Sequence, residues 1–168
     1  RWDYDHWASL GNEGWSYDEI LKYFKKAEHN ETFDDQFHGQ GGPLNVSKIR
    51  HENQPTKDFV EAGSKLYKHN EDFNGEEQEG IGFYQTTQKD GKRCSTAKAY
   101  LVPALDRPNL TVITEANVNK ILIDNNKASG IQYIDSEGES HIISASKEVL
   151  LCSGAFGSPQ ILLRSGVG

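Results

Sequence analysis

The sequence predicts a mixed α+β protein, and three features of the chain lead to this fold class. Amphipathic helix patterns dominate the part of the chain before Pro108. Short β-rich runs separated by turn residues follow Pro108, which is typical of a β-meander. The final part, residues 147–168, places a short apolar run, a glycine turn and a helix pattern in that order. We therefore expect helices first, a meander next, and a strand–turn–helix unit at the end.

The first strong helix signal begins after Ser16. Ser16 and Glu19 form a capping box, in which each residue satisfies a free N–H group at the start of the helix. Apolar residues then recur at helical spacing with lysines outside them, which predicts a helix over 17–29. The preceding stretch, residues 1–8, is both aromatic and charged. We expect a loop or a short helix there, with its aromatic side chains packed against a partner surface.

Two further helices are expected before the β-rich part. Pro55 opens an amphipathic segment that reaches Tyr67. Ser95 can cap a third helix, which ends near Pro103. The acidic stretch 70–82 between them has no helical or strand pattern, and its glutamates favour a solvated loop over a metal site.

Strands are expected wherever a short run is rich in apolar or β-branched residues. These runs are 43–46, 83–87, 110–114, 118–123, 130–134, 140–143 and 149–152. Pairs that contain glycine or asparagine predict the turns between strands and the stop of the final helix. They are Asp90-Gly91, Asn125-Asn126, Glu137-Gly138 and Ser165-Gly166.

The final stretch is the most patterned part of the chain. Its apolar run at 149–152 is long enough for a buried strand, and Gly154 and Gly157 allow a tight turn or a close approach. Ser158-Pro159 then predicts a helix start. A helix N-terminus at such a turn can hold an anionic cofactor, because its free N–H groups and positive end point at the anion. The spacing is not G-x-G-x-x-G, so these residues by themselves favour an ordinary strand-to-helix turn over a cofactor site.

Composition excludes several classes of protein. The chain has 18 basic and 25 acidic residues and a net charge of −7, which argues against binding to nucleic acids or to anionic membrane surfaces. The mean hydropathy of −0.72 predicts a polar, soluble protein. The two cysteines form no disulfide framework and favour a reducing compartment. We expect a cytoplasmic protein, or one that is peripheral to the inner membrane of a bacterium.

The common catalytic and metal-binding signatures are absent. None of the six histidines lies two or four residues from another, and there is no C-x-x-C pair. There is also no G-x-S-x-G elbow for a hydrolase nucleophile. We therefore predict no catalytic residue and no metal ligand in this chain. Since the chain starts at Arg1 and contains no methionine, we interpret it as an internal piece of a longer protein; a mature chain that has lost its leader is the alternative.

Several sequence motifs along the chain resemble those of one protein family. The stretch G-A-F-G-S-P-Q-I-L-L-R-S-G-V-G, residues 154–168, resembles the second signature of the glucose–methanol–choline (GMC) flavoprotein oxidoreductases. The stretches G-W-S-Y-D-E-I-L, H-G-Q-G-G-P-L, D-F-N-G and G-K-R-C-S-T-A-K-A-Y-L are similar to that family in the same order. The resemblance implies a two-domain enzyme with FAD on a Rossmann-type sheet. Residues 1–105 would join the flavin domain to part of the substrate domain, and residues 106–168 would belong to the FAD-binding domain.

The resemblance also implies an activity. The chain most resembles the choline dehydrogenase-like members of the family. The parent protein would therefore oxidise a primary alcohol to an aldehyde by hydride transfer to FAD. The family's glycine-rich FAD motif would precede Arg1, and its catalytic histidine would follow Gly168. We expect this chain alone to be inactive and not to hold FAD tightly. A non-catalytic binding or scaffold module that reuses half of the fold is the alternative.

Cofactor contacts and partners follow from the same resemblance. Val118 matches the position where the family's backbone meets the adenine, and Ser153 and Gly154 follow the strand beneath the cofactor. The expected partners are a small alcohol such as choline and the remainder of the parent chain. Self-association is also expected, through apolar surface around 149–152 and the aromatic residues near the start.

Overall fold

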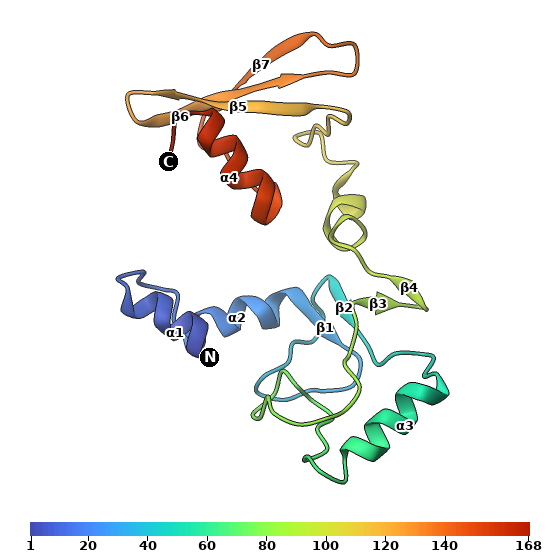
Figure 1. Ribbon diagram of the computed structural model, residues 1–168. Helices are drawn as coiled ribbons and strands as arrows, with labels where there is room; N and C mark the ends of the chain where they lie inside the picture. Colours follow the sequence, from blue (N-terminus) through green and yellow to red (C-terminus); the bar gives the residue numbers. More distant parts are fainter. The chain divides into compact units, whose positions relative to one another are not determined.

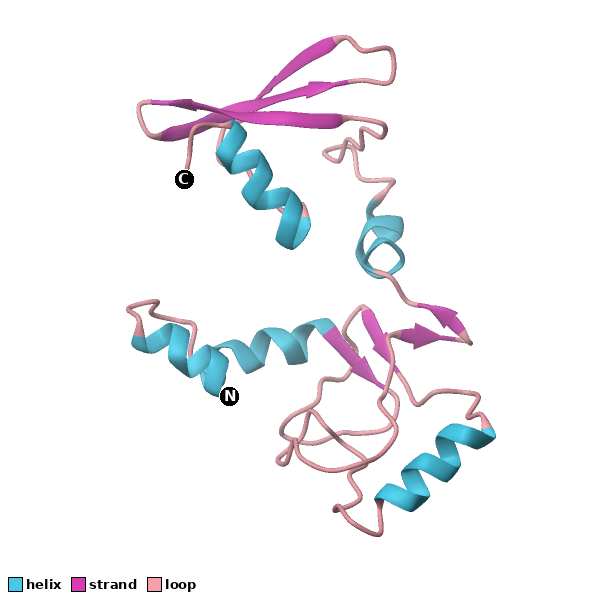
Figure 2. Cartoon of the chain, in the orientation of Figure 1, coloured by secondary structure: helices cyan, strands magenta, loops and turns pink.

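The computed structural model describes residues 1–168 and has both helices and strands, which confirms the mixed fold class (Figures 1 and 2). The chain forms two compact units, residues 1–110 and residues 111–168. The boundary expected from the sequence, between residues 105 and 106, falls inside the first unit. None of the helices is both long and apolar enough to cross a bilayer.

Two helices of the first unit begin close to the predicted positions. Helix α2, Tyr17–Ala27, follows the Ser16–Glu19 capping box, and the Glu19 carboxylate accepts from the Ser16 amide at 3.2 Å. Helix α3, Gln54–Gly63, is capped by Asn53, whose side chain accepts from the amide of Thr56 at 2.9 Å. The aromatic N-terminal stretch forms α1, Trp2–Ser9. Local side-chain hydrogen bonds mark the starts of α2 and α3.

The ends of α2 and α3 differ from the prediction. Strand β1, Glu28–Asn30, takes the last residues of the predicted helix 17–29 and pairs in parallel with β2, Leu44–Val46. The parallel pair satisfies the backbone groups that a longer helix would have used. Helix α3 ends at Gly63, so the part of the predicted segment up to Tyr67 lies in a turn.

A hairpin and a short irregular helix complete the first unit. Strands β3, Gln88–Lys89, and β4, Lys92–Arg93, pair across the predicted Asp90-Gly91 turn, where both residues have positive φ. The third predicted helix is a π-helical turn, η1, Ala97–Leu101, followed by the 3₁₀ turn η2, Val102–Ala104. The Ser95 hydroxyl accepts from the Lys98 amide at 3.2 Å, as expected of a cap.

The second unit is a three-stranded antiparallel meander with one helix against it. Strands β5, Asn117–Asp124, β6, Lys127–Ile134, and β7, Ser140–Ser144, pair in that order. The predicted turns at Asn125-Asn126 and Glu137-Gly138 connect them, and Asn125, Asn126 and Gly138 have positive φ. Helix α4, Gly154–Arg164, packs against β5.

Three predicted strands are wrong. Residues 83–87, 110–114 and 149–152 form no named strand. A strand needs a partner for its N–H and C=O groups, and these runs have no ladder to join within the chain, apart from the isolated bridge between Ser47 and Thr86. Apolar composition alone therefore overpredicted strands here.

Candidate cofactor-binding site

Ser153 and Gly154 lie at the start of α4. Ser153 occupies the N-cap position with φ of −87° and ψ of 10°, and Gly154 has a φ of +81°. A Cβ placed on Gly154 would meet no atom within 4 Å, so the backbone conformation, rather than crowding, favours glycine there. Both residues are exposed. The predicted cofactor residues Ser153 and Gly154 therefore lie at a solvent-exposed helix N-terminus.

Ser158 does not start the helix, contrary to the prediction. It lies inside α4, and its hydroxyl accepts from the Ser153 amide at 3.1 Å. Pro159 is also inside α4, and its missing N–H leaves the carbonyl of Ala155 without a helical partner. The helix still continues to its predicted stop, where Gly166 has a φ of +83°.

The first turn of α4 presents free donors to the outside. The N–H groups of residues 154–156 have no acceptor within the helix, as at any helix start. The helix dipole adds a partial positive charge at the same end. Phe156 in this turn is 93% exposed. This arrangement can bind the phosphates of an anionic cofactor next to an apolar surface.

Val118 lies elsewhere in the second unit. It is half-buried on β5 opposite Tyr133, next to an irregularity in the strand register. The C-terminal end of α4 contacts the middle of β5, where the amide of Ile121 donates to the hydroxyl of Ser165 over 2.8 Å. Since α4 rises about 1.5 Å per residue, Gly154 is about 16 Å along the helix from Ser165. No hydrogen bond joins Val118 to the helix start.

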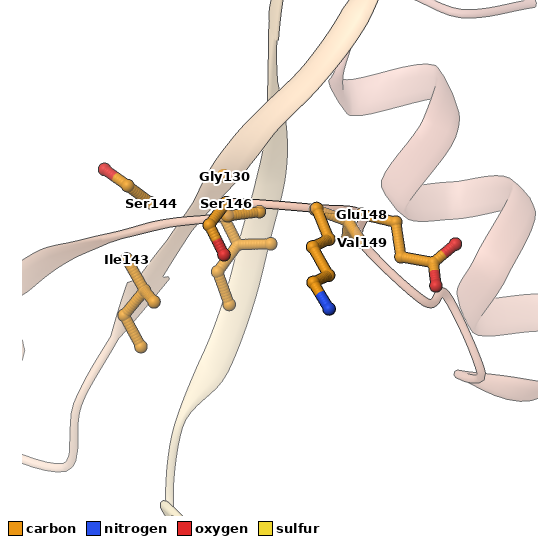
Figure 3. A pocket seen from close by; sticks show the side chains of 9 residues that line it. Gly130, Ile143, Ser144, Ser146, Glu148 and Val149 are labelled. Carbon is orange, nitrogen blue, oxygen red and sulfur yellow. The ribbon is translucent and has the colours of Figure 1, made fainter. Parts of the chain in front are cut away.

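A groove in the second unit is separate from these residues. It has a volume of about 420 Å³ and lies between β6, β7 and the segment that follows β7. Figure 3 shows that segment passing Gly130, with Ser146, Glu148 and Val149 along it. Its volume suits a small ligand. Because Val118, Ser153 and Gly154 do not line it, the groove gives no support to the predicted cofactor contacts.

A second groove lies in the first unit, between α1 and α2, with a volume of about 660 Å³. Its lining is mostly aromatic, and Trp7 and Trp15 meet edge to face with ring centroids 5.7 Å apart. Tyr4 of α1 and Phe24 of α2 also meet edge to face, with ring centroids 5.9 Å apart, which joins the two helices but leaves the aromatic surface partly exposed. Part of the predicted aromatic surface near the start of the chain is thus present.

A histidine between two aspartates is the site that the sequence analysis missed. His38 is 3% exposed, and its Nδ1 lies 2.9 Å from Oδ1 of Asp35. Its Nε2 faces Oδ1 of Asp72 at 3.4 Å. The two carboxylates lie at opposite nitrogens of one ring. The i, i+3 spacing of Asp35 and His38 was a visible signal, but Asp72 is distant in sequence.

In two histidine–aspartate pairs, the pKa of the aspartate is lowered. Burial opposes the charged form of Asp35, yet hydrogen bonds from the His38 ring and from the Phe37 amide hold the pKa of that carboxyl below its usual value. On the β6–β7 hairpin, the His141 ring lies 2.6 Å from Asp135 and lowers the pKa of that carboxyl. Tyr133 stacks on His141, with ring centroids 5.0 Å apart. The second pair is exposed, so it orders the hairpin surface rather than a buried site.

Comparison with known proteins decides the family. The family model described as GMC oxidoreductase matches residues 1–168. The chain belongs to the GMC oxidoreductase family. This GMC chain is 45% identical over 169 residues to an alcohol dehydrogenase [acceptor] of Pseudomonas putida, with 99% of this chain and 31% of that protein covered. It is 44% identical over 171 residues to an oxygen-dependent choline dehydrogenase of Ectopseudomonas mendocina, with 99% and 30% covered.

Solved structures agree with the family assignment. The GMC chain superposes on pyridoxine 4-oxidase from Mesorbium loti with a TM-score of 0.88 at 32% identity, covering 99% of this chain and 33% of that one. It superposes on an FAD-dependent oxidoreductase from Chaetomium thermophilum with a TM-score of 0.89 at 28% identity, covering 99% and 31%. The chain thus spans about a third of the length of the proteins it matches.

Proposed function

We propose that the protein to which this chain belongs is an FAD-dependent oxidoreductase that converts a primary alcohol to an aldehyde. The observation that carries the proposal is the match of the GMC family model to residues 1–168. Relatives named alcohol dehydrogenase and choline dehydrogenase support a small alcohol, such as choline, as the substrate. FAD, when bound, supplies the hydride acceptor, and the polypeptide supplies position and electrostatics.

Within this chain, we assign a share of the FAD contacts to Val118, Ser153 and Gly154. The exposed start of α4 fits an anionic cofactor, because its free N–H groups and dipole favour negative charge. The open surroundings of Gly154 leave room for a ligand beside the backbone. Val118 would meet another part of the same cofactor from β5.

Gly138 gives a matched control for this assignment. It lies in the β6–β7 turn with a φ of +86°, close to the +81° of Gly154, and a Cβ on either residue meets nothing within 4 Å. Asparagine tolerates this backbone region better than other non-glycine residues. Gly154→Asn and Gly138→Asn should therefore strain the chain equally, but only the first adds a side chain at the proposed FAD contact.

The whole protein should be purified and its flavin measured by absorbance. We expect stoichiometric FAD and reduction of an artificial electron acceptor with choline or a short primary alcohol. Gly154→Asn should weaken FAD binding about tenfold, or about 1.4 kcal/mol, while Gly138→Asn binds normally. A folded protein without flavin or turnover would favour the non-catalytic binding module. Equal flavin loss in both variants would remove Gly154 from the site.

We also propose that the remaining polypeptide of the longer enzyme covers the exposed apolar side chains of this chain. Leu150 is 76% exposed and Trp2 is 73% exposed, and both lie in stretches where the sequence predicted apolar surface. The limited coverage of the relatives supports a larger protein around the chain. Isolated residues 1–168 should therefore self-associate. Sedimentation as a monomer at high concentration would contradict this.

A further inference from the structure

Two loops of the first unit meet at one buried imidazole. The His38 loop, residues 31–43, connects β1 to β2, and the Asp72 loop, residues 70–82, follows α3. No hydrogen bond joins the two loops. The Asp35 carboxylate accepts from the Phe37 amide at 2.8 Å in one loop, and the Asp72 carboxylate accepts from the Asn74 amide at 3.0 Å in the other. These turns fix where the two carboxylates stand.

Both ring nitrogens of His38 face a carboxylate. Nδ1 faces the Asp35 carboxylate at 2.9 Å, and Nε2 faces the Asp72 carboxylate at 3.4 Å. Nε2 is buried and has no hydrogen bond of good geometry. A neutral imidazole carries one proton, so it always turns one nitrogen lone pair toward a carboxylate. Only the cation, with a proton on both nitrogens, is attracted to both loops.

The other groups around the ring do not replace this attraction. From α2, the ammonium of Lys25 donates to the backbone carbonyls of Asp35 and Gln36 at 3.1 and 3.0 Å. From β1, the Glu28 carboxylate accepts from the Gly39 amide at 2.8 Å. From the His38 loop itself, the Phe33 ring lies 5.1 Å from the imidazole. None of these groups links the His38 loop to the Asp72 loop.

We propose that His38 is a pH-dependent latch that holds the His38 loop and the Asp72 loop together. Protonated His38 bridges the two carboxylates. When Nε2 releases its proton to solvent, its lone pair faces the Asp72 carboxylate and the attraction between them is lost. The Asp72 loop then separates from the His38 loop. Histidine ordinarily changes charge between about pH 5 and pH 8. Because the cation is the attracted form, the latch is closed on the acid side and opens as the pH rises.

Hydrogen–deuterium exchange of the whole protein tests the latch. Protection in both loops should fall together by about tenfold between about pH 5 and pH 8, after correction for intrinsic exchange rates. Asp72→Asn keeps the shape of the side chain but removes its charge, so its protection should not change with pH. His38→Gln should behave in the same way. His51→Gln, at an exposed histidine of the same unit, should keep the wild-type profile.

Several outcomes would overturn the proposal. Wild-type pH dependence in Asp72→Asn or His38→Gln would show that another group titrates. The same would follow if the two loops lost protection at different pH values. If His38→Gln does not fold, Asp72→Asn still decides the question. A gain in protection on adding zinc would make Nε2 a metal ligand rather than a proton donor, and the latch would be wrong.

Discussion

The amide of Ile121, in the middle of β5, donates to the hydroxyl of Ser165 over 2.8 Å, and the same hydroxyl donates to the carbonyl of Ile161 at 2.6 Å. One serine therefore ends α4 and fastens it to the meander. Ile121 and Ile161 are both buried, so the hydrogen bonds lie beside the apolar contact between helix and sheet. The orientation of the α4 start, with its free N–H groups, depends on this attachment.

Ser165→Ala should loosen this attachment. The variant leaves the Ile121 amide without its acceptor in a partly buried position, which costs about 1–3 kcal/mol. Denaturant unfolding, combined with hydrogen exchange of β5, would measure the loss. Ser146→Ala, which changes an exposed serine of the same unit, should have little effect. Equal stability of the two variants would contradict the role of Ser165.

Asn53→Ala should destabilise α3. Asn53 accepts from the amide and the hydroxyl of Thr56 at 2.9 and 2.7 Å, and loss of such a cap costs about 1 kcal/mol. Thermal unfolding should show the decrease, and Asn53→Asp should restore most of the stability because aspartate caps equally well. A failure of Asn53→Asp to restore stability would mean that the amide has another role.

Gly157→Ala should destabilise the protein, although alanine ordinarily favours a helix more than glycine does. A Cβ on Gly157 would lie 2.9 Å from the Cβ of Ser153, which cannot move without shifting the helix start. Overpacking of this kind costs about 1–3 kcal/mol. Comparison of unfolding free energies with those of Ala155→Gly, in the same turn, would separate crowding from helix propensity. A Gly157→Ala variant as stable as the wild type would show that the first turn can adjust.

Asp35 should contribute to stability against acid. Its pKa is lowered in the folded protein, so its contribution is present above its ordinary pKa of about 3.9 and is lost as the pH falls through the folded value. Asp35→Asn should be less stable at neutral pH and should depend less on pH below about pH 4. Urea unfolding at a series of pH values would measure both effects. Asp34→Asn, at an exposed neighbour, should keep the wild-type pH dependence.

Local signals account for what the sequence predicted correctly. The Ser16–Glu19 box placed the start of α2, and the turns at Asp90-Gly91 and Asn125-Asn126 placed two hairpins. Each signal depends on hydrogen bonds or φ values within a few residues. The family was also recognisable from residues 154–168, because the order of those residues is specific. The cofactor roles of Val118, Ser153 and Gly154 stay predictions.

Contacts between distant residues account for what the sequence did not reveal. The run 149–152 has the composition of a strand but no ladder in this chain, and residues 28–30 leave the helix pattern to pair with 44–46. Asp72 reaches His38 only because the loop after α3 folds back onto the loop after β1.

The sequence by itself determined the starts of α2 and α3, the turns and the family, since each of these depends on neighbouring residues. Only the tertiary structure decided which strands pair, how Ser165 fastens α4 to β5, and that His38 lies between two carboxylates. The physical reason is that hydrogen bonds and ion pairs between distant segments form only after the chain has brought those segments together.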